Sequence, residues 1–306
     1  MQNLKKELRL FKHNSELLLL ALPGLLLLAI FNYAPMFGVI LAFKNYDYGK
    51  KIFGSPWVGF DNFKFFFTSQ DAFRITRNTI LYNAGFILIG TALSVIFALI
   101  LFELSKRAVK VFQTAFLIPY FISWVVVGFV LYALLNPDLG VVNKIIALFG
   151  ADRKLWYSEP DYWPFILMLS YLWKNAGYNC IIFYTGLMGI DLAYFEAAKI
   201  DGATKLQQIC RISIPLLRPL IILLSLLAVG RIFYSDFGLF YFIPMNSGIL
   251  YEVTDVIDTY VYKALRTTGD IGMASAVGLY QSMVGFILVL LSNKLVKRFD
   301  ENSGIF

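Results

Sequence analysis

Six long apolar stretches constrain the fold of this chain more than any other feature. They run over about 17–43, 79–102, 111–135, 162–190, 216–235 and 272–293. A helix of roughly 20 residues crosses the hydrocarbon core of a bilayer, and each stretch is long enough to do so. A chain that is 58% hydrophobic and 15% charged also departs from the composition of soluble domains. We therefore expect an all-α integral membrane protein with six transmembrane helices.

The N-terminal residues 1–16 are basic and precede the first apolar stretch, as in a signal peptide. No small-residue cleavage site follows, and hydrophobicity continues through Phe43, so this stretch is predicted to be an uncleaved span. The polar segments are too short to fold independently. We expect a single transmembrane domain over 17–293, flanked by an N-terminal segment 1–16 and a C-terminal tail 294–306.

The distribution of basic residues predicts the orientation. Just over half of the 27 lysines and arginines lie in the two termini and in the segments 103–110 and 191–218. Because basic residues accumulate on the cytoplasmic side, we expect both termini and these segments inside the cell. The segments at about 44–78, 136–161 and 236–271 then face outward. Short basic runs beside apolar stretches argue against nucleic-acid binding, which would need a continuous basic stripe.

A charged segment between the fourth and fifth apolar stretches has the pattern of a helical elbow. Asp191 is placed to cap a helix that ends at Gly202, because glycine adopts a left-handed backbone at low cost. A second short helix is expected over 203–213, with Pro215 opening the next span. Small residues at 197 and 198 suit insertion into a groove on another protein, although an ordinary solvated loop fits the same pattern.

This segment resembles the EAA motif of bacterial ABC importer membrane subunits. The resemblance lies in Glu196-Ala197-Ala198, Asp201-Gly202-Ala203, Ile212, Pro215 and Pro219. Ile209 and Ile214 replace the more usual Phe and Leu and keep the side chains apolar. In that family the loop, here 191–213, is a cytoplasmic coupling helix that docks on a separate ATPase subunit. The resemblance implies that coupling is carried by Glu196, Ala197, Ala198, Asp201, Gly202 and Ala203.

The N-terminal region resembles LplB-type permeases of carbohydrate-uptake importers. The shared sequences are Pro-Gly-Leu-Leu at 23–26, Tyr-Ala-Pro-Met-Phe-Gly at 33–38, Ala-Phe-Lys at 42–44 and Gly-Ser-Pro-Trp-Val-Gly-Phe at 54–60. The resemblance implies a type I importer permease fold in a bacterial plasma membrane. It also implies a second homologous permease, two ATPase subunits, an extracytoplasmic sugar-binding lipoprotein and an oligosaccharide substrate. ATP and Mg would be bound by the ATPase subunits, with no cofactor on this chain.

We find no residue pattern for catalysis or for a metal site. His13 is the only histidine, and no Gly-x-x-x-x-Gly-Lys-Ser/Thr sequence occurs. Cys180 and Cys210 have no metal-ligand spacing, and their different surroundings argue against a disulfide. The paired carboxylates Asp255 and Asp258 are expected on a solvated face. We therefore expect a protein that is not an enzyme.

Polar and aromatic side chains within the apolar stretches are candidates for the substrate pathway. The main group in 162–190 is Tyr171, Trp173, Lys174, Asn175, Tyr178, Asn179 and Tyr184, and elsewhere we include Tyr120, Trp124, Tyr234 and Asp236. Such groups are costly in lipid, and a saccharide presents hydroxyls to polar groups and C–H faces to aromatic rings. Contacts that hold helices together would explain the same residues. We expect Lys174 to face a cavity or a carboxylate, with Asp236 as one candidate.

Three functions compete for this pattern. A permease subunit that forms half of a pathway for complex oligosaccharides explains both the elbow and the polar groups. A stand-alone secondary transporter or channel is the alternative, but it would place coupling carboxylates deep in the spans, and we find none. An integral membrane enzyme would need a catalytic cluster. Co-purification of an ATPase from native membranes distinguishes the first function from the other two.

Overall fold

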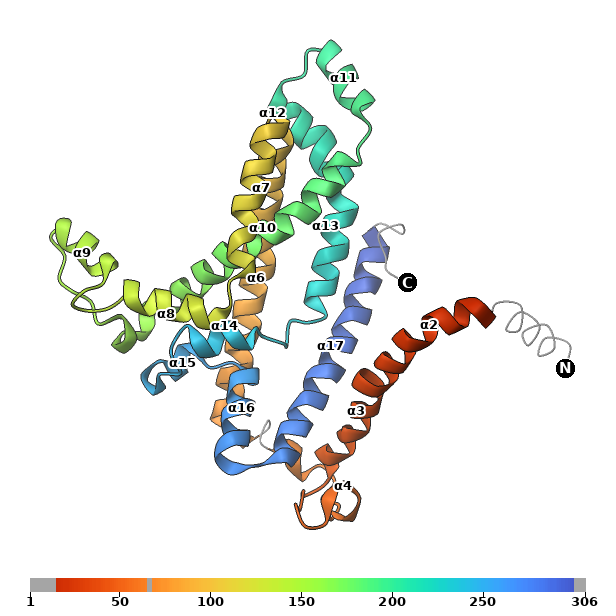
Figure 1. Cartoon of the computed structure of the whole chain (residues 1–306), viewed down its shortest axis with the longest axis vertical. Coiled ribbons are helices and arrows are strands. Elements are labelled where there is room, and N and C mark those ends of the chain that lie inside the picture. Colours follow the sequence, from red (N-terminus) through yellow and green to blue (C-terminus); the bar gives the residue numbers. More distant parts are fainter. Residues whose placement is uncertain (1–14, 65–67, 300–306) are drawn as a thin grey trace, which may run out of the picture. The chain divides into compact units, whose positions relative to one another are not determined.

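The computed structural model describes residues 15–64 and 68–299, and these residues form helices joined by short loops (Figure 1). The only strand-like pairing in the described ranges is an isolated bridge between Lys44 and Trp57. The chain divides into two compact units. Of the described residues, unit 1 comprises 15–64 and 268–279, and unit 2 comprises 68–267 and 280–299.

Unit 1 begins with one long apolar helical rod. Its successive parts are α2 (Ser15–Leu28), the π-helical turn η1 (Ala29–Tyr33), α3 (Ala34–Met36) and the 3-10 helix η2 (Phe37–Phe43). The π turn directly precedes Pro35, whose missing N–H and bulky ring disturb regular α-helical bonding. The rod from Leu19 to Phe43 is long and apolar enough to cross a membrane, as the sequence predicts.

The rest of unit 1 is a folded polar segment with the short helices α4 (Lys51–Gly54) and η3 (Asp61–Phe63), and the first turns of α17 (Ile271–Phe299). The buried Lys44 ammonium donates hydrogen bonds of 2.9 Å to the carbonyls of Ile52 and Phe53. The Asn62 amide donates to the carbonyls of Ala42 and Lys44 at 3.0 and 2.9 Å. The Asn62 bonds reach carbonyl groups where η2 ends, and the Lys44 bonds reach carbonyl groups of α4.

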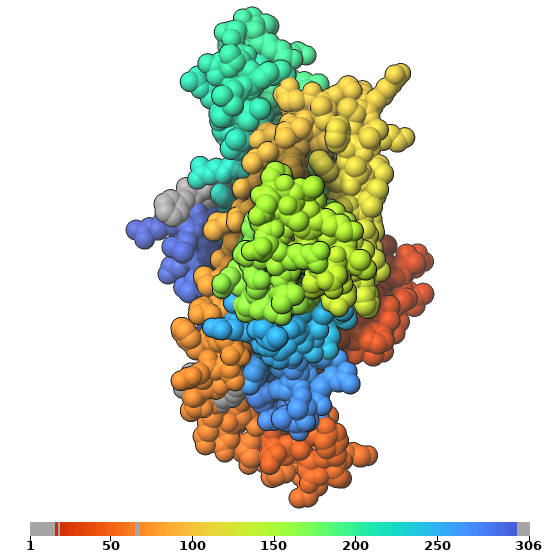
Figure 2. All heavy atoms as spheres, turned by 90° about the vertical axis from the view of Figure 1, so that its left-hand side faces the viewer, coloured from red at the N-terminus to blue at the C-terminus, as the bar shows by residue number. Residues whose placement is uncertain are grey.

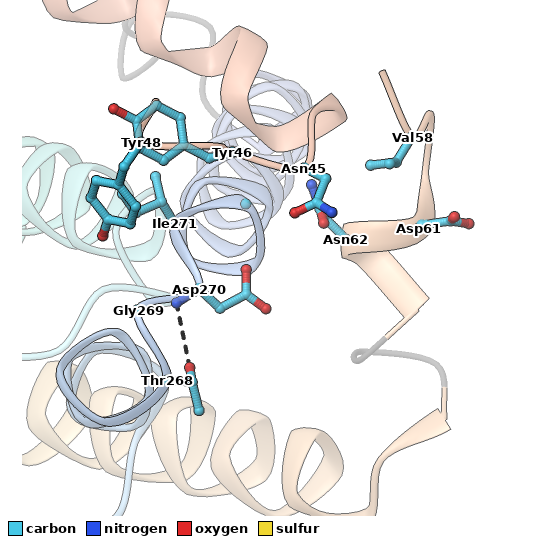
Figure 3. Close-up of a pocket in the computed structure, with 11 residues that line it drawn as sticks. Asn45, Tyr46, Tyr48, Val58, Asp61, Asn62, Thr268, Gly269, Asp270 and Ile271 are labelled. Atoms are coloured by element: carbon cyan, nitrogen blue, oxygen red, sulfur yellow. Dashed lines mark hydrogen bonds between the residues drawn. The ribbon is translucent and has the colours of Figure 1, made fainter. Parts of the chain in front are cut away.

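A polar pocket of about 600 Å³ lies within unit 1 (Figure 3). Figure 3 shows Tyr46 and Tyr48 on one side of it and Asn45 and Asn62 on the other, with the Asp270 carboxylate between them. Asp270 also accepts a 2.8 Å hydrogen bond from the Met273 amide in the first turn of α17. No local sequence pattern predicts this pocket, because its walls come from segments about 200 residues apart.

Unit 2 contains the remaining helices. They are α6 (Gln70–Glu103), α7 (Lys106–Phe121), α8 (Trp124–Leu134), α9 (Val141–Leu148), η4 (Trp156–Ser158), η5 (Pro160–Tyr162), α10 (Trp163–Met188), α11 (Leu192–Ile200), α12 (Lys205–Gln208), the π-helical turn η6 (Ile209–Ser213), α13 (Ile214–Val229), α14 (Phe237–Phe242), η7 (Gly248–Leu250), α15 (Tyr251–Thr254) and α16 (Ile257–Thr268). The part of α17 from Tyr280 onward also belongs to this unit.

The core of unit 2 is built on the packing of α6 against α10, with two buried clusters along it. One cluster is centred on Phe86, Trp163 and Phe240. The other includes Leu101 and Phe183. Figure 2 shows α11 and α12 at one end of this unit, with the green segment 136–162 lying over the blue α14 and α15. The elbow and the segments of unit 2 that are predicted to face outward thus lie in different parts of this unit.

The helices agree with the prediction of an all-α membrane protein, and they differ from it in two places. Within residues 15–64 and 68–299, four helices are long and apolar enough to span a membrane, or up to six if two bent pairs each form one span. The predicted third span is broken, because α7 and α8 meet at an angle of 94°. The predicted fifth span begins earlier than expected, because Lys205–Val229 is one continuous helix. The orientation of the chain stays a prediction.

Of the paired carboxylates in the segment 236–271, Asp255 is buried and Asp258 is half-buried, so the prediction of a solvated face is wrong. Asp255 is 3% exposed and forms a 2.8 Å ion pair with Lys263. Asp258 accepts a 2.8 Å hydrogen bond from the Ser235 amide. On α6, the Asn78 amide donates to the main-chain carbonyls of Glu252 and Asp255 at 2.9 and 3.0 Å. This segment is folded against α6, which a loop-like sequence pattern does not reveal.

Candidate functional site

The first half of the elbow has the structure that the sequence predicts. The Asp191 carboxylate accepts a 2.9 Å hydrogen bond from the Ala193 amide and so caps α11. Gly202 follows the helix with a φ of +76°, in the left-handed region. The Ala203 amide donates to the Ala198 carbonyl at 2.9 Å, which closes the end of the helix. The backbone at Gly202 is therefore a requirement of this turn.

The second half of the elbow differs from the prediction of a separate short helix. Thr204 and Gln207 form a reciprocal capping box that starts α12. The helix then continues through the π turn η6 into α13 without a break. The Ile214 amide donates to the Ile209 carbonyl, and this wider turn directly precedes Pro215. The π turn accommodates Pro215 inside a continuous helix. The sequence instead predicts Pro215 at the start of a new helix.

The elbow is anchored to α6 by two side-chain contacts. Phe195 is 6% exposed, and its ring centroid lies 5.4 Å from that of Phe102 on α6. Lys205 forms an ion pair with Glu103, the last residue of α6. One face of α11 therefore packs against α6, and any force on α11 reaches α6 directly.

The opposite face of the elbow is open. The predicted coupling residues Glu196, Ala197, Asp201 and Gly202 are exposed, and Ala198 and Ala203 are half-buried. Ile200 is 87% exposed and Leu206 is 70% exposed. Among the described residues, neither Glu196 nor Asp201 has an ion-pair partner. Two free carboxylates beside exposed aliphatic side chains form a surface suited to a protein partner.

The break between α7 and α8 brings together five of the predicted pathway residues. We call Tyr120, Trp124, Lys174, Tyr178 and Asp236 the break cluster. The rings of Tyr120 and Tyr178 are stacked with centroids 4.3 Å apart. The Trp124 indole nitrogen donates a 2.6 Å hydrogen bond to the Asp236 carboxylate. Tyr120, Tyr178 and Asp236 are exposed, so the cluster offers aromatic faces and a carboxylate at one accessible place.

Lys174 lies behind these exposed groups and is only 8% exposed. Its ammonium donates hydrogen bonds to the main-chain carbonyls of Pro119 and Tyr120, at 3.2 and 2.7 Å, and to that of Ile122. The ammonium also lies 5.2 Å from the centre of the Trp124 ring. The expectation of a cavity or a carboxylate is thus corrected: within the described residues the Lys174 ammonium binds carbonyls, and Asp236 binds Trp124 instead.

The other predicted pathway residues do not join the break cluster. Tyr171 stacks on Phe86 in the first core cluster, with centroids 3.8 Å apart, and Tyr184 packs against the second. The Asn175 amide donates to the Tyr171 carbonyl on its own helix. The Tyr234 hydroxyl lies 2.7 Å from that of Ser282. Trp173 is exposed and Asn179 half-buried on α10.

Sequence reasoning missed the break itself, although two local signals were present. Pro119 lies in the last turn of α7, and the Ser123 hydroxyl accepts a hydrogen bond from the Val126 amide at the start of α8. A serine directly before an apolar run is a common helix start. The uninterrupted hydrophobicity of 111–135 hid this signal.

A family model described as "Binding-protein-dependent transport system inner membrane component" matches residues 90–301 of this chain. The chain belongs to this family. Members are membrane components of transport systems, so the chain is a multi-pass protein of the bacterial plasma membrane. The family is defined by the membrane component and not by an ATPase, in agreement with the lack of a phosphate-binding loop in the sequence.

Individual relatives and solved structures are similar to this chain over almost its whole length. Protein LplB of Bacillus subtilis (strain 168) is 36% identical over 96% of the chain and 92% of the relative. The polygalacturonan/rhamnogalacturonan transport system permease protein YteP of the same organism is 34% identical over 95% and 90%. A bacterial ABC transporter involved in the import of the acidic polysaccharide alginate is 32% identical, with a TM-score of 0.86 over 96% and 99% of the two chains.

A second structure, the alginate transporter in complex with an alginate pentasaccharide-bound periplasmic protein, has a TM-score of 0.85 at 31% identity, over 95% and 97% of the two chains. These findings confirm the predicted type I permease fold. They also confirm that the chain is an ABC permease subunit of the sugar-import type. The roles of individual residues in the elbow and the break cluster stay predictions.

Proposed function

We propose that this chain forms half of the translocation pathway of an ATP-driven importer of complex oligosaccharides and is coupled to ATP hydrolysis through the elbow. The observation that carries the proposal is the similarity to the alginate importer over almost the full length of both chains. The name of the relative YteP, a polygalacturonan/rhamnogalacturonan permease, points to the same class of substrate. A second homologous permease would supply the other half of the pathway.

We place the elbow in the cytosol. The basic residues of 191–218 and of the termini support this orientation. The elbow also lies at one end of unit 2, while α14 and α15 lie toward the other, so the two sets of loops are suited to opposite sides of a membrane (Figure 1). Two ATPase subunits, which carry ATP and Mg, would then bind below, and an extracytoplasmic sugar-binding protein would deliver the substrate above. This chain would bind no nucleotide and catalyse no reaction.

The contacts of the elbow explain how movement would be transmitted. Closure of the ATPase pair would push on the exposed side of α11. Because Phe195 packs on Phe102 and Lys205 pairs with Glu103, that push would move α6 together with the elbow. Because α12 continues into α13, the same push would move a second helix. The bundle would switch between inward- and outward-facing states as a set of rigid helices.

The break cluster is the part of unit 2 best suited to contact sugar. The exposed rings of Tyr120 and Tyr178 offer apolar faces for the C–H surface of a pyranose. The exposed carboxylate of Asp236 can accept hydrogen bonds from hydroxyl groups. A few polar groups among aromatic walls is the usual composition of a small-molecule site. We propose that this cluster lines the pathway in this subunit.

Reconstitution of the complete importer in proteoliposomes tests this proposal. The variant Glu196→Lys with Asp201→Lys reverses both free carboxylates of the elbow. We expect it to reach the membrane in normal amount but to lose sugar-stimulated ATP hydrolysis and uptake. The matched control is Asp138→Lys with Asp152→Lys, which reverses two exposed carboxylates of the segment 136–161 and should retain coupling. Normal sugar-stimulated ATP hydrolysis in the elbow variant would refute the proposed role of the elbow.

A further inference from the structure

We propose that Lys174 is a positioning residue that fixes the break between α7 and α8. Its ammonium binds the main-chain carbonyls at the end of α7 and so sets where the exposed aromatic residues of the break cluster lie. Its effect on transport rests on the proposed function of the chain, whereas its effect on the break does not.

The end of α7 needs a hydrogen-bond donor, and Lys174 supplies one from a neighbouring helix. The last carbonyls of a helix have no partner within it and carry partial negative charge. α7 ends at Phe121, and the carbonyls of Pro119, Tyr120 and Ile122 surround the break. An ammonium has three N–H donors and no acceptor. All three donors of Lys174 are therefore used by this one turn of backbone, and none is left for a sugar.

A glycine on α10 allows Lys174 to come this close. A Cβ at Gly177 would lie 2.1 Å from the Phe116 carbonyl oxygen of α7, so the two backbones touch at this point. Residues 174 and 177 are three apart and therefore lie on the same face of α10. The close approach at Gly177 thus places the ammonium beside the end of α7, one turn further along.

The other side of the break is fixed by Trp124. Its indole donates to Asp236, and the same carboxylate accepts hydrogen bonds from the Gly238 and Leu239 amides, at 3.0 and 3.3 Å, to cap α14. A Cβ at Gly238 would lie 2.3 Å from the Trp124 ring, so α14 packs directly against the start of α8. The Trp124 ring also lies beside the Lys174 ammonium. One continuous set of contacts therefore joins α10, the break and α14.

This geometry separates a positioning role from a substrate-binding role. A residue that holds the break should change the rate of transport and the angle of the break when it is replaced. A residue that contacts sugar should change the KM and leave the angle unaltered. The buried position of Lys174 and its complete set of carbonyl partners favour the first behaviour.

Distance measurements between two nitroxide labels test the inference. The labels are placed at the exposed positions Val111 on α7 and Phe129 on α8, after Cys180→Ala and Cys210→Ser. Lys174→Met removes every donor and should shift or broaden the distance distribution across the break. In the reconstituted importer its maximal rate of uptake should fall about tenfold, as expected for loss of about 1.4 kcal/mol of positioning free energy, with little change in KM.

Two further variants keep the test decisive if Lys174→Met fails to insert. Lys174→Arg keeps the charge and several donors and should restore the narrow distribution. Lys174→Gln keeps two donors without charge and should give an intermediate result. The control Thr185→Met replaces a polar side chain of α10 whose hydroxyl bonds only its own helix, and it should leave the distances unchanged.

Unchanged label distances in both Lys174→Met and Lys174→Gln would overturn the inference, and so would a raised KM with normal distances. Failure of the proposed function would look different. A parent complex with no sugar-stimulated ATP hydrolysis would refute transport by this subunit, while the label distances would still report on the role of Lys174.

Discussion

Replacement of Gly202 is the most direct test of the elbow, because the structure separates backbone strain from steric clash at this position. The φ of Gly202 is +76°, and nothing lies within 4 Å of the place that a Cβ would occupy. A larger side chain therefore meets no neighbour in unit 2. For any residue that keeps the amide N–H, the whole cost of a substitution arises from the left-handed backbone, which only glycine adopts freely and asparagine tolerates.

The expected magnitudes follow from that separation. Gly202→Asn should retain most activity. Gly202→Ala costs about 1 kcal/mol of left-handed strain, which lowers the population of the intact elbow up to about fivefold. Gly202→Pro cannot reach a positive φ and also loses the amide that donates to the Lys199 carbonyl at 3.1 Å. Its cost of about 3 kcal/mol or more corresponds to a loss of about a hundredfold.

Sugar-stimulated ATP hydrolysis in the reconstituted importer is the assay, with membrane insertion measured in parallel. The order of activity should be Gly, Asn, Ala and Pro. Gly150 provides a control, since its φ is +78° and it too has open space at its Cβ position. Gly150→Pro imposes the same backbone change in the segment 136–161 and should leave coupling intact. Full coupling in Gly202→Pro, or equal losses at both glycines, would refute the reasoning.

Two further predictions concern the folded segment 236–271. Lys263→Met leaves the buried Asp255 carboxylate without its ion-pair partner and should destabilise the protein by about 3 kcal/mol. We expect a lowered midpoint of thermal unfolding in detergent. An unchanged midpoint would contradict the importance of the ion pair. Burial raises the pKa of the Asp258 carboxyl, against hydrogen bonds that lower it. The folded state therefore binds this proton more tightly than the unfolded state, so the contribution of Asp258 to stability should decrease as the pH rises from about 4 through the raised pKa. Asp258→Asn should remove that part of the pH dependence, and an identical profile in the variant would disprove the assignment.

The sequence predicted those features that depend on neighbouring residues. Asp191 caps α11 and Gly202 ends it because both roles are local to a few residues of backbone. The apolar stretches predicted the membrane-spanning helices for the same reason, since hydrophobicity over about 20 residues is enough to indicate a span.

The features that sequence reasoning missed depend on distant partners. The break at 122–123 is bound by Lys174, about 50 residues along the chain, and no local pattern shows that contact. The burial of Asp255 depends on the packing of its segment against α6, through the amide of Asn78. The continuity of α12 with α13 depends on a π turn, which absorbs Pro215 where a proline usually marks a helix start.

The length of α6 has a consequence for communication across the membrane. With 34 residues, this helix extends over about 50 Å, well beyond a hydrocarbon core of about 30 Å. Asn78 fastens one end to the α15 region, and Phe102 and Glu103 fasten the other to the elbow. One continuous helix therefore joins the α15 region to the elbow, and a displacement at one end can be transmitted to the other without a flexible joint between them.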